Sequence, residues 1–374
     1  MEIEAFITNL PKVELHIHIE GTLTPELRWQ LGHKNGIALP FDSFEELEAS
    51  YRPDPDDERI GADGLARFLK QYFGGLEVLR TASDFYELGM RYFRSAAAMN
   101  VRHAEVFFDP QAHTERGVPI AEVMQGLQDA QGQAKQELGM TCDYILCFLR
   151  SMSAESAEEI YDLCQPYRHT MFCGVGLDGA EAGRPPLLFR SIFERAARDG
   201  LKVTSHCDFA QPNTHEHIKQ CASTICGTGL DRIDHGLSAA DSRELIEMIK
   251  NNDIGMTLCP NAYNRRWSDH EVYPLIRRLF DADIKITINS DDPTYMNDKW
   301  IVHNMQMVRD RCPFSDVEMI QLAKNAIDIC WASPARKKQL MDELFRYQDR
   351  MISGKTPACK VVEISGLVPL PSLT

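Results

Sequence analysis

The chain has 374 residues, of which 44% are hydrophobic and 25% are charged, and a net charge of −15. This composition is typical of a soluble globular protein and excludes a disordered or fibrous chain. The negative charge disfavours binding to nucleic acid or to an anionic membrane, because an excess of basic residues binds phosphates and acidic lipids. We therefore expect a small-molecule ligand, no nucleic-acid partner and no membrane partner.

The apolar runs of the chain are short, and none approaches the roughly 18 to 20 residues that a membrane-spanning helix requires. The N-terminal Met1-Glu2-Ile3-Glu4 is acidic and lacks the basic and apolar regions of a secretory signal. The 11 cysteines are spread through apolar segments without a C-x-x-C pair, which favours reduced thiols over a disulfide framework. These features predict a cytoplasmic protein, while the oligomeric state cannot be inferred from them.

Short β-rich apolar runs alternate with stretches of helical periodicity along most of the chain. Such alternation predicts parallel strands joined by crossover helices, and eight units predict a closed (β/α)₈ TIM barrel of the α/β class. No low-complexity linker interrupts the pattern, so we expect residues 1–374 to form a single domain. The predicted strands are 13–18, 101–108, 142–149, 171–177, 201–206, 231–235, 254–259 and 284–290.

The long segment between the first two predicted strands departs from the regular alternation. It contains helical patterns at 64–80 and 83–98, and we expect residues 25–100 to form a helical insertion, or lid, over the barrel mouth. Further helical patterns follow the eighth strand and close the barrel. Residues 355–374 contain prolines and are expected to form a tail.

Histidines and aspartates end several of the predicted strands, where the active site of a (β/α)₈ barrel lies. His16 and His18 are two residues apart on one strand, so they share a face. His206 ends the fifth strand and Asp291 the eighth, and both project into the same mouth if the barrel forms. Three imidazole nitrogens and one carboxylate oxygen suit zinc, with a position left for water. The sequence thus predicts one Zn²⁺ per chain.

A bound divalent ion lowers the pKa of its water toward 7, which gives a hydroxide nucleophile and therefore hydrolytic chemistry. His235 ends the sixth strand and is predicted to orient the attacking water or to stabilise its developing charge. Asp292 diverges from Asp291 because adjacent strand residues point to opposite faces. It is predicted to hydrogen-bond the substrate, with a helix N-cap as the alternative.

Several motifs in the chain resemble those of the adenosine/adenine deaminase family of zinc-dependent amidohydrolases, most closely the adenine deaminase branch. They occur in the family's order over most of the chain. The resemblance implies the TIM barrel, zinc on the four proposed ligands, His235 beside the activated water and Asp292 on a purine. The motifs are His16-Ile17-His18-Ile19-Glu20-Gly21-Thr22, His103-Ala104-Glu105-Val106-Phe107-Phe108-Asp109-Pro110-Gln111, Cys147-Phe148-Leu149-Arg150, Gly174-Val175-Gly176-Leu177-Asp178, Arg232-Ile233-Asp234-His235-Gly236, Cys259-Pro260-Asn261 and Asn289-Ser290-Asp291-Asp292-Pro293.

Two acidic residues within these motifs are predicted to bind the substrate. Adenosine-specific members of the family carry an Asp that serves the ribose at the position of Glu20, whereas the adenine branch has Glu there. Glu20 therefore indicates a free base or a differently substituted purine rather than a nucleoside, although a salt-bridged carboxylate at the barrel mouth is the alternative. Asp178, at the end of the fourth strand's motif, is expected to contact the substrate as well.

One position departs from the family pattern. The family follows the third metal histidine with Ala-Gly-Glu, and that Glu moves protons between the attacking water and the ring nitrogen. Here the sequence is His206-Cys207-Asp208-Phe209, so a phenyl ring stands where the Glu is expected. Asp208 is the nearest carboxyl group, but an offset of one residue directs it elsewhere unless the loop bends.

Three functions remain open from the sequence. In the first case, Asp208 replaces the glutamate, and the protein deaminates adenine or an N6-substituted or otherwise modified adenine, releasing ammonia or an amine. Alternatively, the same zinc site hydrolyses another amino-heterocycle, such as a pterin. In the third case, the protein is a catalytically impaired purine-binding protein.

Other polar residues have ordinary structural explanations in the sequence. We expect Cys207 to be a packed thiol, and His215 and His217 to lie on the solvated face of a helix. The pair Arg265-Arg266 is expected at the surface, although one of the two could meet an anionic substituent. Asp109 is expected either in the pocket wall or in a buried hydrogen bond.

Overall fold

The computed structural model describes residues 3–52 and 62–353. Eight parallel strands pair in sequence order, which confirms the predicted (β/α)₈ barrel. The proposed tail, 355–374, lies outside the described residues, as does part of the proposed insertion, 53–61. The strands are β1 (Lys12–Glu14), β2 (Val101–Phe108), β3 (Thr141–Leu149), β4 (Phe172–Asp178), β5 (Lys202–Cys207), β6 (Arg232–His235), β7 (Gly255–Leu258) and β8 (Ile286–Ile288).

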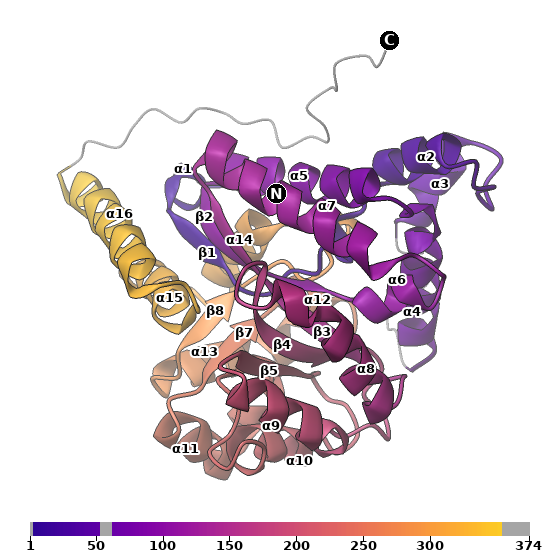
Figure 1. Ribbon diagram of the computed structural model, residues 1–374. Coiled ribbons are helices and arrows are strands. Elements are labelled where there is room, and N and C mark those ends of the chain that lie inside the picture. Colours follow the sequence, from indigo (N-terminus) through magenta and orange to yellow (C-terminus); the bar gives the residue numbers. More distant parts are fainter. Residues whose placement is uncertain (1–2, 53–61, 354–374) are drawn as a thin grey trace.

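Helices surround this sheet on its outer face (Figure 1). Most begin at side-chain caps; α15, for example, starts with a capping box between Ser315 and Glu318. The helices are α1 (Ala5–Asn9), α2 (Pro25–Lys34), α3 (Phe44–Ser50), α4 (Ala62–Gly75), α5 (Ala82–Ala98), α6 (Pro110–Thr114), α7 (Ile120–Gln133), α8 (Ala154–Cys164), α9 (Arg190–Arg198), α10 (Thr214–Lys219), α11 (Arg243–Asn251), α12 (Pro260–Asn264), α13 (Asp269–Asp281), α14 (Ile301–Arg311), α15 (Asp316–Ile329) and α16 (Pro334–Ile352).

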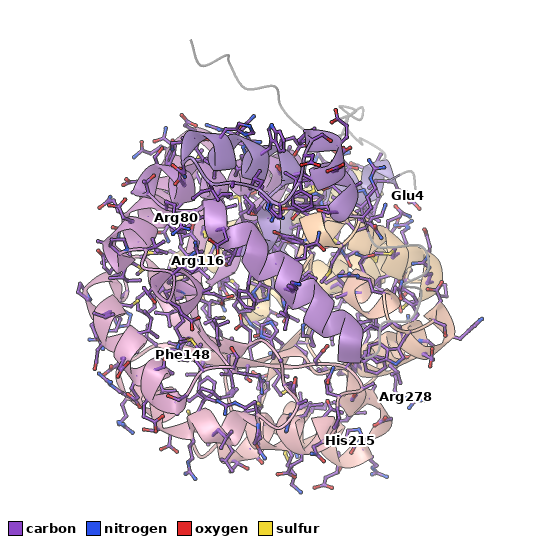
Figure 2. The ribbon with its side chains drawn as sticks, turned by 90° about the vertical axis from the view of Figure 1, so that its right-hand side faces the viewer. Glu4, Arg80, Arg116, Phe148, His215 and Arg278 are labelled. Atoms are coloured by element: carbon purple, nitrogen blue, oxygen red, sulfur yellow. The ribbon has the colours of Figure 1, made fainter. Side chains whose placement is uncertain are left out.

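The segment between β1 and β2 contains helices α2 to α5. In Figure 2, α4 crosses in front of the ring of helices. Phe68, Tyr72 and Phe73 of α4 line the cavity at the barrel mouth. This helix therefore covers the end of the barrel at which the candidate site lies.

The first strand is shorter than predicted, and the difference matters for the site. Regular pairing of β1 ends at Glu14, but the chain continues along the barrel wall through isolated bridges from Ile17 to Asp291 and from His18 to Phe107. The His18 amide donates to the Asp291 carbonyl at 3.2 Å, and the Asp291 amide donates to the His16 carbonyl at 3.1 Å. The backbones of three candidate metal ligands therefore close the barrel between its first and last strands.

The barrel interior is tightly filled below the mouth. Phe107, Ile145 and Cys147 form a separate apolar cluster, against which Trp331 packs from the end opposite the mouth. Glycine in β4 provides the space: a Cβ at Gly174 would lie 2.5 Å from the Trp331 ring, and one at Gly176 would lie 2.7 Å from the Cys147 sulfur. The interior is thus a packed core that leaves only the mouth for a ligand.

A buried ion pair spans the lower part of this interior. The guanidinium of Arg232 lies 2.5 Å from the carboxylate of Glu105, and both side chains are fully buried. The same guanidinium stacks on Trp331 at 4.1 Å, and Glu105 also accepts the Trp331 backbone N–H. The pair therefore ties β2, β6 and the segment before α16 together.

We expect Glu105→Gln to lower the free energy of unfolding by about 1.5–3 kcal/mol, because it removes a charged hydrogen bond and leaves the buried Arg232 with Asp234, 3.6 Å away, as its remaining carboxylate. Chemical denaturation followed by circular dichroism measures this effect. Glu247→Gln, which removes the exposed partner of Arg243, should leave the midpoint unchanged. Equal midpoints for both variants would contradict a stabilising role for the buried pair.

Candidate metal centre and active site

Four side chains predicted as metal ligands meet at the barrel mouth. His18 Nε2 lies 3.1 Å from His206 Nε2 and 3.7 Å from Asp291 Oδ1, and His16 Nε2 lies 3.5 Å from the same oxygen. Tetrahedral zinc with bonds of about 2.0–2.1 Å holds its ligand atoms about 3.3–3.4 Å apart. The observed spacings match that geometry, so the four residues can hold one ion.

Hydrogen bonds on the far side of two imidazoles fix which nitrogen faces the centre. His206 Nδ1 lies 3.1 Å from the Leu177 carbonyl, which only accepts, so this nitrogen carries the proton. His16 Nδ1 lies 2.9 Å from the Thr257 hydroxyl, whose own proton is donated to Asp234 at 2.8 Å. His16 therefore donates to Thr257. Both Nε2 atoms direct lone pairs at the centre, as metal-ligating histidines do.

The third imidazole has a carboxylate as its outer partner, since His18 Nδ1 lies 3.5 Å from Asp178 Oδ2. The Nε2 atoms of the three rings thus converge with the Asp291 carboxylate, and His16 Nε2 is buried without a hydrogen-bond partner among the described residues. Nearby carboxyl groups, Asp292 first, raise the pKa of His18. Burial lowers the pKa of His16 and of His206 well below the ordinary value, which keeps these imidazoles neutral. Such a group of acceptors is stabilised by a cation at its centre.

His235 is oriented differently from the three ligand histidines. Its Nδ1 lies 3.1 Å from the Tyr263 hydroxyl, which already accepts the Cys259 amide at 3.2 Å and so keeps its own proton for His235. That arrangement places the His235 proton on Nε2, which points toward Asp291 Oδ2 at 3.9 Å. His235 is therefore arranged to donate a hydrogen bond to a group at the centre. Tyr263 was not predicted, because its role depends on a contact between neighbouring loops.

The loop after β5 bends. Asp208, one residue before the expected glutamate position, can face the site only if it does so. Asp208 lines the cavity, whereas Phe209 is buried against Trp267 and Tyr263, with ring centroids 4.7 and 6.0 Å away. Ala210 follows with a φ of 54°, a left-handed conformation that turns the chain. The carboxylate therefore faces the cavity, and the phenyl ring belongs to the core.

Surrounding groups hold Asp208 in place. Its carboxylate accepts from Arg266 at 2.8 Å and from Gln211 at 3.1 Å. Its backbone N–H donates to Glu181 at 2.8 Å, and its carbonyl accepts from Thr214 at 3.0 Å. A side chain fixed through both its backbone and its carboxylate is preorganised for contact with a ligand.

The structure corrects the prediction for one of the two helix histidines. His217 is buried, with Nδ1 2.5 Å from the Glu181 carboxylate that also holds Asp208. His215 lies at the edge of the molecule (Figure 2) and pairs with the exposed Asp241. The pattern at the start of α10 could not distinguish the two, because the partner of His217 follows β4. Glu181, which lines the cavity, was missed as well.

Further carboxylates lie along the cavity wall. Burial raises the pKa of Asp292 to about 8 and, with the charges of its acidic neighbours, raises the pKa of Asp109 well above its usual range. Asp178 also lines the cavity. Glu20 is not among the lining residues: it is buried and accepts from His113 and from the Asp109 amide, both at 3.0 Å. The wall is therefore rich in carboxyl groups, of which Asp109 and Asp292 hold their protons more tightly than an exposed aspartate.

Two arginines face this acidic wall. Arg265 and Arg266 are half-buried and both line the cavity, which is compatible with the alternative that one of them meets an anionic substituent. Arg266 is bound to Asp208, as described above, and Arg265 stacks on the Phe68 ring of α4 at 5.4 Å. The ten cysteines within the described ranges are free, as expected, and Cys207 is buried. No helix in the same ranges is long and apolar enough to cross a bilayer.

Comparison with known proteins agrees with this geometry. The family model described as adenosine deaminase matches residues 11–347. An adenine deaminase of Rhodospirillum rubrum is 40% identical over 338 residues, covering 90% of this chain and 96% of that protein. The crystal structure of adenine deaminase from Arthrobacter aurescens superposes with a TM-score of 0.81 at 34% identity, covering 91% and 99% of the two chains. A Burkholderia ambifaria amidohydrolase with bound Zn gives 0.81 at 25% identity, covering 94% and 96%.

We expect Thr257→Val to weaken metal binding about 10- to 100-fold, because it removes the acceptor that fixes the His16 ring. Competitive titration of metal-free protein with a zinc chelator measures this affinity. Thr287→Val, a matched change of a buried threonine on the neighbouring strand β8, should leave it unaltered. Equal affinities for the two variants would show that Thr257 does not orient the ligand.

Proposed function

Because the chain belongs to the adenosine deaminase family and is a hydrolytic deaminase of an adenine-like base, we propose that its substrate is adenine or an N6-substituted adenine. We further propose that a single zinc ion is its cofactor. The observation that carries the proposal is the convergence of three imidazole lone pairs and one carboxylate at the barrel mouth. The acidic, acceptor-rich cavity beside them suits a base that offers N–H donors.

The ligands proposed for zinc are His16, His18, His206 and Asp291. Their Nε2 and Oδ1 atoms are spaced as a tetrahedral ion requires, and three outer partners hold the rings in the ligating orientation. When bound, zinc activates a water molecule for attack on the ring carbon that carries the amino group.

His235 and Asp208 are proposed to manage the water and its protons. His235 donates from Nε2 and so orients the attacking oxygen, as its contact with Tyr263 requires. Asp208 accepts a proton from the water and delivers it to the ring nitrogen beside the reacting carbon. Cleavage of the carbon–nitrogen bond, with a second proton on the departing nitrogen, then releases ammonia or an amine and leaves a carbonyl group on the ring.

The remaining predicted residues are proposed to hold the base. Asp292 and Asp178 line the cavity and present carboxylate oxygens to it. Glu20 lies behind Asp109, and its Oε2 is buried without a hydrogen-bond partner. Its contact with the substrate therefore stays a prediction. Helix α4 is proposed to act as the lid that excludes water from the cavity.

A screen for ammonia or amine release tests the substrate. Purified zinc-loaded protein should deaminate adenine or an N6-alkyladenine in preference to adenosine and to pterins. Preference for a pterin would instead identify a hydrolase of another heterocycle. Tight binding of purines with no product from any compound would identify a binding protein without turnover.

We expect Asp208→Asn to lower kcat about 10²- to 10⁴-fold, the usual contribution of a general acid or base. Zinc content and KM should change little, because the amide keeps the shape of the side chain. Steady-state kinetics with metal analysis measures all three quantities, and Asp241→Asn serves as the exposed control. Unchanged kcat would exclude Asp208 as the proton carrier.

Removal of metal tests the cofactor. Dialysis against a chelator should abolish turnover, and one equivalent of Zn²⁺ per chain should restore it. Elemental analysis of His206→Asn should show a large loss of bound zinc. A fully active protein without metal would contradict the proposed mechanism.

A further inference from the structure

The carboxyl groups of Asp109 and Asp178 make no hydrogen bond with the described residues, and His18 Nδ1 approaches Asp178 Oδ2 only to 3.5 Å. Asp178 Oδ1 and Oδ2 and Asp109 Oδ1 are buried without a hydrogen bond among the described residues. Asp109 and Asp178 are only 2% and 3% exposed, and both line the cavity. Buried acceptors that lack a donor are costly. A bound ligand that offers N–H groups would remove that cost.

These acceptors lie at a defined place relative to the metal centre. His18 directs Nε2 toward the centre and Nδ1 toward Asp178, so Asp178 is about one imidazole width farther along the wall. Potential ligand atoms of His18, Asp109 and Asp178 lie within 4.8 Å of one another. In a purine, the amino-bearing carbon and the five-membered ring are on opposite sides. A base that reacts at the centre can therefore place its five-membered ring beside Asp109 and Asp178.

We propose that Asp109 and Asp178 form a subsite that accepts the ring N–H at N9 of an unsubstituted purine. This inference rests on the proposed deaminase function and adds a criterion for the substrate. A base with a free N9–H satisfies the orphan acceptors. A methyl group or a sugar at N9 removes that donor and leaves the carboxylates unpaired, so 9-substituted purines are rejected.

The charge of the surrounding wall is consistent with this assignment. Glu181 and Asp208 add further carboxylates to the cavity, and Arg266 is engaged by Asp208. A phosphate group supplies acceptors and negative charge, and both are unfavourable beside Asp109 and Asp178. The subsite thus favours a free base over a nucleoside and disfavours a nucleotide most strongly.

The test compares adenine with 9-methyladenine as substrates for the wild-type protein and two variants. Asp109→Asn keeps the shape of the side chain but replaces its carboxyl group by an amide, and Asp109→Ala adds space. We expect kcat/KM for adenine to fall about 10- to 100-fold in both variants, which is the value of a hydrogen bond to a charged group. Activity on 9-methyladenine should start low and stay low. The ratio of kcat/KM for adenine to kcat/KM for 9-methyladenine should therefore decrease, because only the value for adenine falls.

A purely steric wall gives a different result. In that case Asp109→Ala would leave adenine turnover unchanged and raise turnover of 9-methyladenine, which would overturn the proposal. Wild-type protein that processes 9-methyladenine as well as adenine would overturn it too. Asp143→Asn, a matched change on β3 away from the cavity lining, is the control. Zinc content and thermal unfolding of each variant exclude a general loss of folding.

Binding measurements separate this inference from the proposed function. Calorimetric titration of zinc-loaded Asp208→Asn with each base reports affinity without turnover. Tighter binding of adenine than of 9-methyladenine, lost in Asp109→Asn/Asp208→Asn, supports the subsite even if adenine proves not to be deaminated. Equal affinities for the two bases would reject the subsite even if adenine is the substrate.

Discussion

The candidate site depends on the approach of three imidazole rings and one carboxylate to a common point at the barrel mouth. His18 Nε2 lies 3.1 Å from His206 Nε2, and Asp291 Oδ1 lies 3.5 and 3.7 Å from the Nε2 atoms of His16 and His18. Outer contacts support this arrangement: Leu177 and Thr257 accept hydrogen bonds from the far nitrogens of two rings, and Asp178 lies 3.5 Å from the far nitrogen of the third. Burial of these polar groups without a cation costs folding free energy, and a cation bound at this point would offset that cost.

The parts of the site carried by regular strands could be predicted from the sequence. The period of two places His16 and His18 on one face, and the rules of the (β/α)₈ barrel bring His206 and Asp291 to the same mouth. These residues depend only on strand direction and order, which hydrophobic patterning reveals. The helical segment between β1 and β2 was visible for the same reason, as a stretch too long and too periodic for a simple connection.

The parts carried by loops and by outer contacts could not be predicted. Asp208 rather than Phe209 lines the cavity because the loop turns at Ala210, which has a left-handed backbone conformation. No pattern in the sequence predicts this turn. Likewise, His217 and Tyr263 acquire their roles from partners on other loops, Glu181 and His235. Local periodicity assigns such residues to a helix surface or a core, because it contains no information about which loops meet.

The same residues close the barrel and form the candidate metal centre. The amides of His18 and Asp291 complete the ring of strands through the carbonyls of Asp291 and His16, while the side chains of the same residues approach each other at the centre. An ion bound by these side chains would also hold the seam between β1 and β8 closed, so metal binding would stabilise the fold.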